Sequence, residues 1–301
     1  MKESCERLDE VELEHGPEVG AKRDAACALL KHATKAKSEH AILNGVRYKG
    51  SLLSLANRLA SVGLFFNRKL PTYYDGYWIW LPRKNWNSLI SRYELHTGRT
   101  MKAHLRAGDT FWDIGANIGW FSLLASKIVK SNGKIFAFEP SPDVFKLLSV
   151  DIRGLNHIHA IQCGVGNADT IMAFAAHGAS SSASFVEEVT KINQHYLPEI
   201  PIQKVKVNLR RVDTLVKQLG RPRLIKIDVE GFEFEVLKGA TDLLSAGSDR
   251  PILLIEIHPP QLELSGGCEV ALLQFLKEYG YEWEVIDRNP NSLYAIIAKP
   301  V

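Results

Sequence analysis

Apolar runs alternate with helical patterns from Thr110 onward, and this alternation indicates the fold of the larger part of the chain. Strands are predicted at TFWDIG, KIFAFEP, IHAIQCGVG, LIKIDVEG and ILLIEIHP. Segments with helical spacing, such as GWFSLLASKIV and SPDVFKLLSVDI, separate most of these strands. Strands that alternate with helices imply right-handed crossovers and a mostly parallel sheet that is covered on both faces.

The C-terminal segment carries two further strands, YEWEVIDR and SLYAIIAKP, which are joined by the short sequence NPN. Strands with so short a connection pair as an antiparallel hairpin. A parallel sheet finished by such a hairpin differs from the doubly wound NAD-binding arrangement. The sequence therefore predicts an α/β fold with a mostly parallel, Rossmann-like sheet and an antiparallel C-terminal hairpin.

The N-terminal quarter of the chain has a different pattern. Residues 1–20 are rich in acids and show little apolar periodicity, which is typical of a disordered tail. Helix formers dominate from Ala21, and apolar residues recur at helical spacing in SLLSLANRLASVGLFF. We therefore expect a helical N-terminal extension or cap over residues 21–73 and the main domain over residues 74–301. Within that main domain, YWIWLP is expected to be a strand and NSLISRYELHTGRTMKAHL a helix.

Composition and charge narrow the class of protein only slightly. The chain has 301 residues, of which 46% are hydrophobic and 24% charged, with a net charge of +3. That charge is too small to indicate nucleic-acid binding, and no apolar run approaches the roughly 20 residues of a membrane helix. The four cysteines form no CxxC pair, which argues against a structural zinc site and a disulfide framework. Together with an acidic N-terminus unlike a signal peptide, they predict a cytoplasmic protein.

The motif DIGANIG lies where the first strand of the sheet meets its helix. Ligands of open α/β sheets bind beyond the carboxyl ends of strands, and Gly115 and Gly119 would let a ligand approach the backbone closely. An ordinary tight turn is the alternative. A dinucleotide site needs G-x-G-x-x-G, but Asn117 and Trp120 replace the second and third glycines. Asp113 would also repel a pyrophosphate, whereas it would attract a cationic ligand without phosphate, such as S-adenosylmethionine.

A second acid, Glu139, follows the next strand in FAFEP, 24 residues beyond Gly115. There it can accept hydrogen bonds from both hydroxyls of a ribose, although an acid at the start of a helix is also common. Cys163, in QCGVG after the third strand, is expected near the adenine; a small buried residue would look the same. The predicted cofactor site consists of Asp113, Gly115, Asn117, Gly119, Glu139, Pro140, Cys163 and Gly164.

Two neighbouring strands carry polar residues where a buried strand is expected to be apolar. Alternation places Lys226, Asp228 and Glu230 on one face of LIKIDVEG, and Glu256 and His258 on one face of LLIEIHP. One interpretation is structural: Lys226 and Glu256 form a buried pair, while Asp228 and Glu230 begin the next helix. The other is catalytic: His258 or Asp228 accepts the proton of a hydroxyl group, and Glu230 orients the acceptor. A divalent metal on these residues is less favoured, because sequence spacing alone does not place them within bonding distance.

The motifs DIGANIG, FEPSP, CGVG, KIDVEGFEFEVLKGA and IEIHP, in this order, resemble the FkbM family of S-adenosylmethionine-dependent methyltransferases. The resemblance covers about Tyr74 to Pro300. It implies a class I methyltransferase fold, S-adenosylmethionine as the cofactor, and a hydroxyl, often on a sugar or polyketide, as the methyl acceptor. The absence of an (N/D)PP(Y/F) turn after the fourth strand also favours an oxygen acceptor.

These patterns leave three classes of function to distinguish. The favoured class is an O-methyltransferase that acts on a small molecule or glycan, as a monomer or a homodimer. The second is a catalytically silent module that binds S-adenosylmethionine or a partner protein. The third is an NAD-dependent oxidoreductase, which the missing glycines and Asp113 disfavour.

Overall fold

The computed structural model describes residues 40–43, 46–49, 69–74, 77–82, 92–178, 183–194, 201–288 and 293–301. The chain divides into two compact units, residues 1–66 and residues 67–301. No helix within the described ranges combines the length and the apolar character that crossing a membrane requires.

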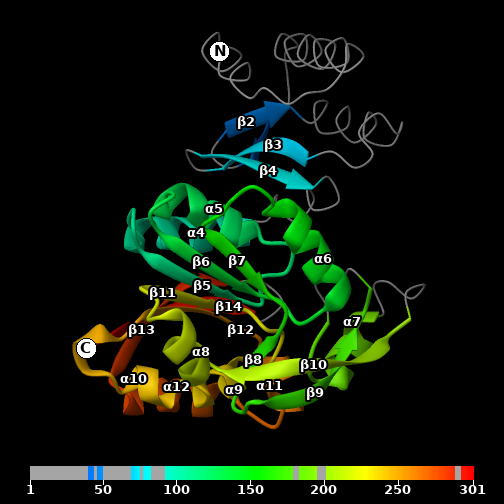
Figure 1. Ribbon diagram of the computed structural model, residues 1–301, viewed down its shortest axis with the longest axis vertical. Coiled ribbons are helices and arrows are strands. Elements are labelled where there is room, and N and C mark those ends of the chain that lie inside the picture. The colour runs from blue at the N-terminus through cyan, green and yellow to red at the C-terminus, as the bar shows by residue number, and fades with distance from the viewer. Residues whose placement is uncertain are drawn as a thin grey trace. The chain divides into compact units, whose positions relative to one another are not determined.

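A seven-stranded sheet forms the centre of the second unit (Figure 1). Five strands are parallel, and the C-terminal hairpin adds two strands that run antiparallel to their neighbours. This is the strand order of class I methyltransferases, so the predicted fold class is confirmed. Side by side, the strands are β13 (Tyr281–Arg288), β14 (Tyr294–Pro300), β12 (Ile252–Ile257), β11 (Leu224–Ile227), β5 (Thr110–Ile114), β6 (Lys134–Phe138) and β7 (Ile158–Ile161).

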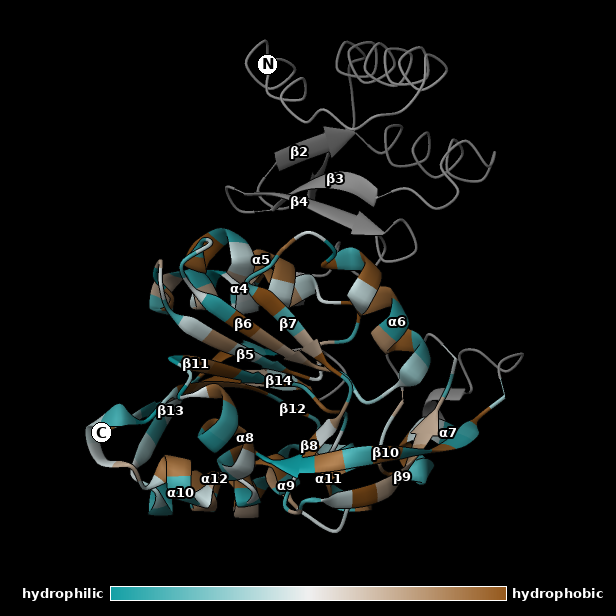
Figure 2. Cartoon of the chain, in the orientation of Figure 1, coloured by the Kyte–Doolittle hydropathy of each residue, from teal (hydrophilic) through white to brown (hydrophobic). Residues whose placement is uncertain are grey.

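Helices cover both faces of this sheet, as the alternating pattern predicts (Figure 1). Phe111 packs into the core on one face and the next residue, Trp112, into the core on the other. The central strands are accordingly hydrophobic for most of their length (Figure 2). The first face carries α4 (Arg92–His104), α5 (Trp120–Val129) and α6 (Pro142–Asp151), and the second carries α8 (Val212–Leu219), α9 (Glu233–Lys238), α10 (Thr241–Leu244), α11 (Pro259–Leu264) and α12 (Glu269–Glu278).

A second, three-stranded sheet lies beside the first and was not predicted. Its strands are β8 (Gly164–Gly166), β10 (Gln203–Arg211) and β9 (Thr170–Ala176), in this spatial order, and α7 (Glu187–Gln194) lies between β9 and β10 in the chain. The segment IHAIQCGVG, predicted as one strand, is split between β7 of the large sheet and β8 of the small one. The apolar pattern continues through both strands, so it gives no sign that the chain changes sheets between them.

The helical expectation for residues 21–73 is wrong in the parts of it that the structure describes. There β1 (His40–Leu43) pairs with β2 (Val46–Lys49), and β3 (Lys69–Tyr74) pairs with β4 (Tyr77–Pro82). The sequences between the paired ends are Asn-Gly and Asp-Gly, which favour two-residue hairpin turns and here outweigh helix propensity.

Other predictions for this part of the chain have mixed outcomes. The strand YWIWLP is confirmed as β4, and the predicted helix that leads into the main fold is confirmed as α4. The acidic tail over residues 1–20 and the helix over residues 51–66 lie outside the described residues. The two compact units meet between Phe66 and Asn67, seven residues before the predicted domain start at Tyr74.

Candidate active site

A cleft opens at the carboxyl ends of β5, β6 and β11, next to the small sheet. It has about 630 Å³ of space that no protein atom fills, its open mouth included. Six of the eight residues predicted to bind the cofactor line this cleft: Gly115, Asn117, Glu139, Pro140, Cys163 and Gly164.

The glycine turn after β5 forms one wall of the cleft. Gly115 and Asn117 adopt left-handed backbone conformations, with φ of +79° and +51°. A side chain on Gly115 would place its Cβ only 1.8 Å from the carbonyl oxygen of Asp228. The turn therefore packs directly against the end of β11, and this close approach requires glycine.

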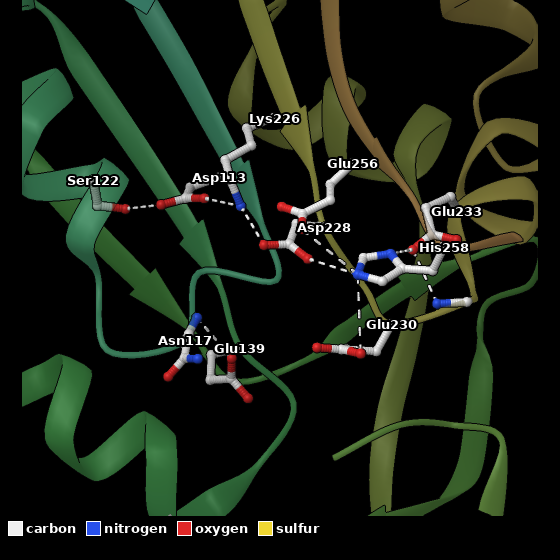
Figure 3. Close-up of polar contacts among 11 residues, drawn as sticks. Asp113, Asn117, Ser122, Glu139, Lys226, Asp228, Glu230, Glu233, Glu256 and His258 are labelled. Carbon is white, nitrogen blue, oxygen red and sulfur yellow. Dashed lines mark hydrogen bonds and ion pairs between the residues drawn. The ribbon is translucent and has the colours of Figure 1, made fainter. Parts of the chain in front are cut away.

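Glu139 is held in place by backbone groups at the end of β6 (Figure 3). Its Oε2 accepts a hydrogen bond from the Asn117 N–H at 2.9 Å, and its Oε1 accepts one from the Ser141 N–H at 2.8 Å. Burial raises the pKa of Glu139 to about 7, although these two hydrogen bonds act to lower it. Each oxygen keeps a second lone pair, so the carboxylate can accept further hydrogen bonds from a ligand in the cleft.

Asp113 does not line the cleft, although its carboxylate was expected to contact the ligand. The side chain is fully buried beneath the glycine turn, where Ser122 Oγ donates to Oδ2 at 2.6 Å. Lys226 Nζ lies 4.0 Å from Oδ1. Burial raises the pKa of Asp113, while Lys226 and Ser122 act to lower it. Gly119 also lies away from the cleft, because it begins α5 and packs against Leu148.

Polar side chains of β11 and β12 approach each other as the alternation predicts, but their pairing differs. Lys226 Nζ donates to Asp228 Oδ2 at 2.9 Å, so the short contact of Lys226 is with Asp228 rather than with Glu256. Burial acts to lower the pKa of Lys226, but the carboxylates of Asp228, Asp113 and Glu256 outweigh it and hold the pKa above its ordinary value. Lys226 is therefore a fixed positive charge beneath the cleft.

His258 lies behind Asp228 and does not line the cleft (Figure 3). Its Nδ1 shares a hydrogen bond with Glu233 Oε1 at 2.9 Å. Its Nε2 lies 4.0 Å from Asp228 Oδ1, 3.9 Å from Glu230 Oε2 and 3.7 Å from Glu256 Oε1. Burial acts to lower the pKa of His258, but the carboxylates around it, Glu233 first, raise the pKa well above its ordinary value.

Asp228 and Glu230 both line the cleft, and their side chains are 27% and 24% exposed. Burial acts to raise the pKa of Asp228, but Lys226 and His258 outweigh it and leave the pKa below its ordinary value. Burial raises the pKa of Glu230 to about 7. The backbone turns sharply here, with φ of +51° at Glu230 and +94° at Gly231, and the hydroxyl of Ser184 donates to the Glu230 carbonyl at 3.0 Å.

An apolar wall, which was not predicted, bounds the cleft on the side of the small sheet. Phe174 of β9 and Phe185 line the cleft, with their ring centroids 4.9 Å apart, and Phe185 lies 5.0 Å from Phe232. Glu233, the partner of His258, was also missed. No periodic signal in the sequence marks these residues, since the wall depends on how the small sheet folds back onto the large one.

The strand order and the cleft at the carboxyl edge define a class I methyltransferase, the fold of enzymes that transfer the methyl group of S-adenosylmethionine. The chain matches the methyltransferase FkbM domain over residues 113–283, which is more than half of its length. The chain belongs to this family. The predicted resemblance is thereby confirmed, and the oxidoreductase interpretation is set aside.

Curated relatives support the same class. Methyltransferase 1 of Beauveria bassiana is 31% identical over 144 residues, which cover 43% of this chain and 57% of the relative. The hexuronic acid methyltransferase AglP of Haloferax volcanii is 28% identical over 177 residues, 58% of this chain and 66% of the relative. This chain thus spans less than two thirds of either relative. A solved FkbM methyltransferase from Methylobacillus flagellatus KT is 17% identical, with a TM-score of 0.41, covering 64% of this chain and 43% of that chain.

Proposed function

We propose that this protein is an S-adenosylmethionine-dependent O-methyltransferase that acts on a hydroxyl of a sugar or polyketide-type small molecule. The observation that carries the proposal is that Asp228 and Glu230 place carboxylates in the same cleft as Glu139 and the glycine turn. Groups suited to a nucleoside and groups suited to a hydroxylated acceptor therefore share one site.

The names of two relatives also support an oxygen acceptor. One is the hexuronic acid methyltransferase of Haloferax volcanii. The other is the 31-O-demethyl-FK506 methyltransferase FkbM of Streptomyces tacrolimicus, 27% identical over 175 residues, which cover 50% of this chain and 67% of the relative. A sugar acid and an oxygen of a polyketide-type compound are the acceptor types that these names indicate.

The residues of the cleft fit S-adenosylmethionine. Glu139 offers two free lone pairs to the ribose hydroxyls, and Gly115 and Asn117 of the glycine turn line the cleft beside it. Cys163 and Gly164 lie on the side where we expect the adenine. When bound, S-adenosylmethionine supplies a methyl group on a positively charged sulfur, and the carboxylates of the cleft complement that charge.

The polar residues next to this position are suited to hold the acceptor. Methyl transfer is an in-line displacement, so the acceptor oxygen has to be fixed opposite the leaving sulfur. Asp228 and Glu230 can accept hydrogen bonds from the acceptor and take up the hydroxyl proton. Lys226 fixes the orientation of the Asp228 carboxylate from behind. His258, predicted as a candidate base, lies too deep to reach the acceptor directly and acts on Asp228 instead.

Calorimetric titration with S-adenosylmethionine tests the cofactor, with NAD as a parallel control. We expect binding of S-adenosylmethionine alone, weakened at least ~10-fold by Glu139→Gln, which is about 1.4 kcal/mol. Glu263→Gln, at an exposed position of α11, serves as the matched control and should bind like the natural protein. Binding of NAD alone, or equal affinities of the two variants, would contradict the assignment.

Turnover of hydroxylated acceptors tests the chemistry. We expect S-adenosylhomocysteine to form with a sugar or polyketide alcohol, and Asp228→Asn to lower kcat by roughly 10²–10⁴-fold while cofactor binding persists. Cofactor binding without product from any hydroxylated acceptor would instead favour the catalytically silent module.

A further inference from the structure

The position of His258 Nε2 among three carboxylates indicates a site for a further ligand. The side chain is 2% exposed, and Nε2 is directed at Asp228, Glu230 and Glu256 (Figure 3). The three oxygens lie 3.7 to 4.0 Å away, beyond the ~2.7–3.2 Å of a hydrogen bond. A buried nitrogen that faces three carboxylates at this range leaves space for a small cation between them.

The distances among the candidate ligand atoms suit a common ion. One atom each of Asp228, Glu256 and His258 lies within 4.8 Å of the others. Ligands that are ~2.0–2.2 Å from one ion lie at most ~4.4 Å apart, so small side-chain rotations bring all three into range. The ends of β11 and β12 thus bring Asp228, Glu256 and His258 close together, which the spacing of these residues in the sequence could not show.

The other atoms of two of these ligands are held by buried partners. Lys226 binds Asp228 Oδ2, which leaves Oδ1 facing His258, and Glu233 binds His258 Nδ1, which leaves Nε2 facing the carboxylates. Outer partners of this kind orient the ligands in protein metal sites, and a bound cation would take the place of the proton on Nε2. The arrangement is therefore already preorganised for a cation.

The charge balance of the cluster supports the same conclusion. Among the residues drawn in Figure 3, acidic groups outnumber basic ones, and a bound cation would offset negative charge in this partly buried cluster. The cluster contains the acids Asp113, Asp228, Glu230, Glu233 and Glu256 and the bases Lys226 and His258 (Figure 3).

We propose that Asp228, Glu256 and His258 bind a divalent first-row transition cation such as Mn²⁺ or Zn²⁺ at the edge of the cleft. Imidazole together with carboxylates suits such ions. The inference rests on the proposed O-methylation, in which the cation would polarise the acceptor hydroxyl. The acceptor hydroxyl gives its proton to Glu230, and the hydroxyl oxygen bonds to the transferred methyl carbon. The carbon–sulfur bond breaks, and its electron pair stays on sulfur.

The test is a calorimetric titration of the chelator-treated full-length protein with MnCl₂ and, separately, ZnCl₂. We expect one site per chain, and we expect Glu256→Gln and His258→Gln to weaken its affinity at least ~10-fold, which is the usual order for a lost metal contact. Glu263→Gln should bind as the natural protein does. Because His258 is buried, circular dichroism checks that its variant folds, and Glu256→Gln, at a side chain that is 19% exposed, gives the same information without that risk.

A parallel titration with S-adenosylmethionine separates this proposal from the proposed function. If neither metal binds, or if Glu256→Gln binds as tightly as Glu263→Gln, the cation site is wrong, even where cofactor binding and turnover persist. If a metal binds through Glu256 and His258 but S-adenosylmethionine does not bind, the cation site holds and the proposed function fails. Chelation that lowers turnover, with recovery on adding Mn²⁺ or Zn²⁺, supports both.

Discussion

If Glu139 binds the ribose as proposed, cofactor affinity depends on pH through one buried carboxyl. Its pKa is raised to about 7 by burial, with the nearby carboxylates of Asp113 and Asp228 adding to the effect. In the proposed binding mode a ribose hydroxyl donates to the ionised form, so binding requires Glu139 to lose its proton. We expect the affinity for S-adenosylmethionine to be constant well above pH 7 and to fall by up to about tenfold per pH unit below it.

Calorimetry from pH 6 to pH 8.5 measures this dependence. Glu139→Gln provides the control, because glutamine cannot ionise and the variant should bind weakly with a flat profile over the same range. If the natural protein also gave a flat profile, Glu139 would not be the titrating group that controls binding.

Gly115 and Gly154 offer a matched pair for testing the close contact beneath the cleft. Both have a positive φ, but a Cβ at Gly115 meets the Asp228 carbonyl at 1.8 Å, whereas a Cβ at Gly154 meets nothing within 4 Å. We expect Gly154→Ala to cost ~1 kcal/mol of unfolding free energy from backbone strain alone. Gly115→Ala should cost more, by about 2 kcal/mol or above, and should also abolish cofactor binding. Urea unfolding measures both changes, and equal costs would contradict the contact.

At the level of elements, Lys226 ties β11 to β5 and, through Asp113 and Ser122, to α5. Lys226→Met removes the buried positive charge between the carboxylates of Asp113 and Asp228, so we expect a loss of ~3–5 kcal/mol of unfolding free energy. Adding Asp113→Asn should recover part of this loss, because one of the uncompensated charges disappears. Equilibrium urea unfolding of the single and double variants checks the coupling, and strictly additive effects would argue against it.

The elements of the large sheet could be predicted because each carries its own local signal. Alternation also assigned the faces correctly: Ile225 and Ile227 pack in one core, while Lys226 points to the opposite side. The small sheet could not be predicted in the same way, since β8 continues the apolar pattern of β7 and departs from it only in space. In the N-terminal part, the Asn-Gly and Asp-Gly pairs indicate hairpins, but the many helix-forming residues there led to the prediction of helices.

The site shows the same division. Which residue types gather at the carboxyl edge follows from strand order, and six of the predicted cofactor residues do line the cleft. How deeply each side chain is buried does not follow from strand order, because burial depends on packing between the layers. Asp113 and His258, for example, are buried and do not line the cleft. The wall of Phe174 and Phe185 depends on contacts between two sheets, which no local pattern encodes.

On the scale of the whole molecule, the match to the FkbM domain lies entirely within the second compact unit, residues 67–301. Compact units of this size commonly fold alone. We therefore expect a protein that begins at Asn67 to keep the urea midpoint and the S-adenosylmethionine affinity of the full chain. Loss of either property would show that residues 1–66 contribute to the fold or to the site.

Two different sheets line the cleft: the ends of β5, β6 and β11 belong to the large sheet, and Phe174 of the apolar wall belongs to the small one. In the described part of the chain, β8, β9 and β10 form strand ladders with one another and none with the large sheet. Mutations that reshape Phe174, Ala183 or Phe185 therefore leave the glycine turn and Glu139 in place. We therefore expect that evolution, or a protein engineer, could change acceptor preference by replacing these three wall residues while Gly164 of β8 and the other predicted cofactor residues stay unchanged.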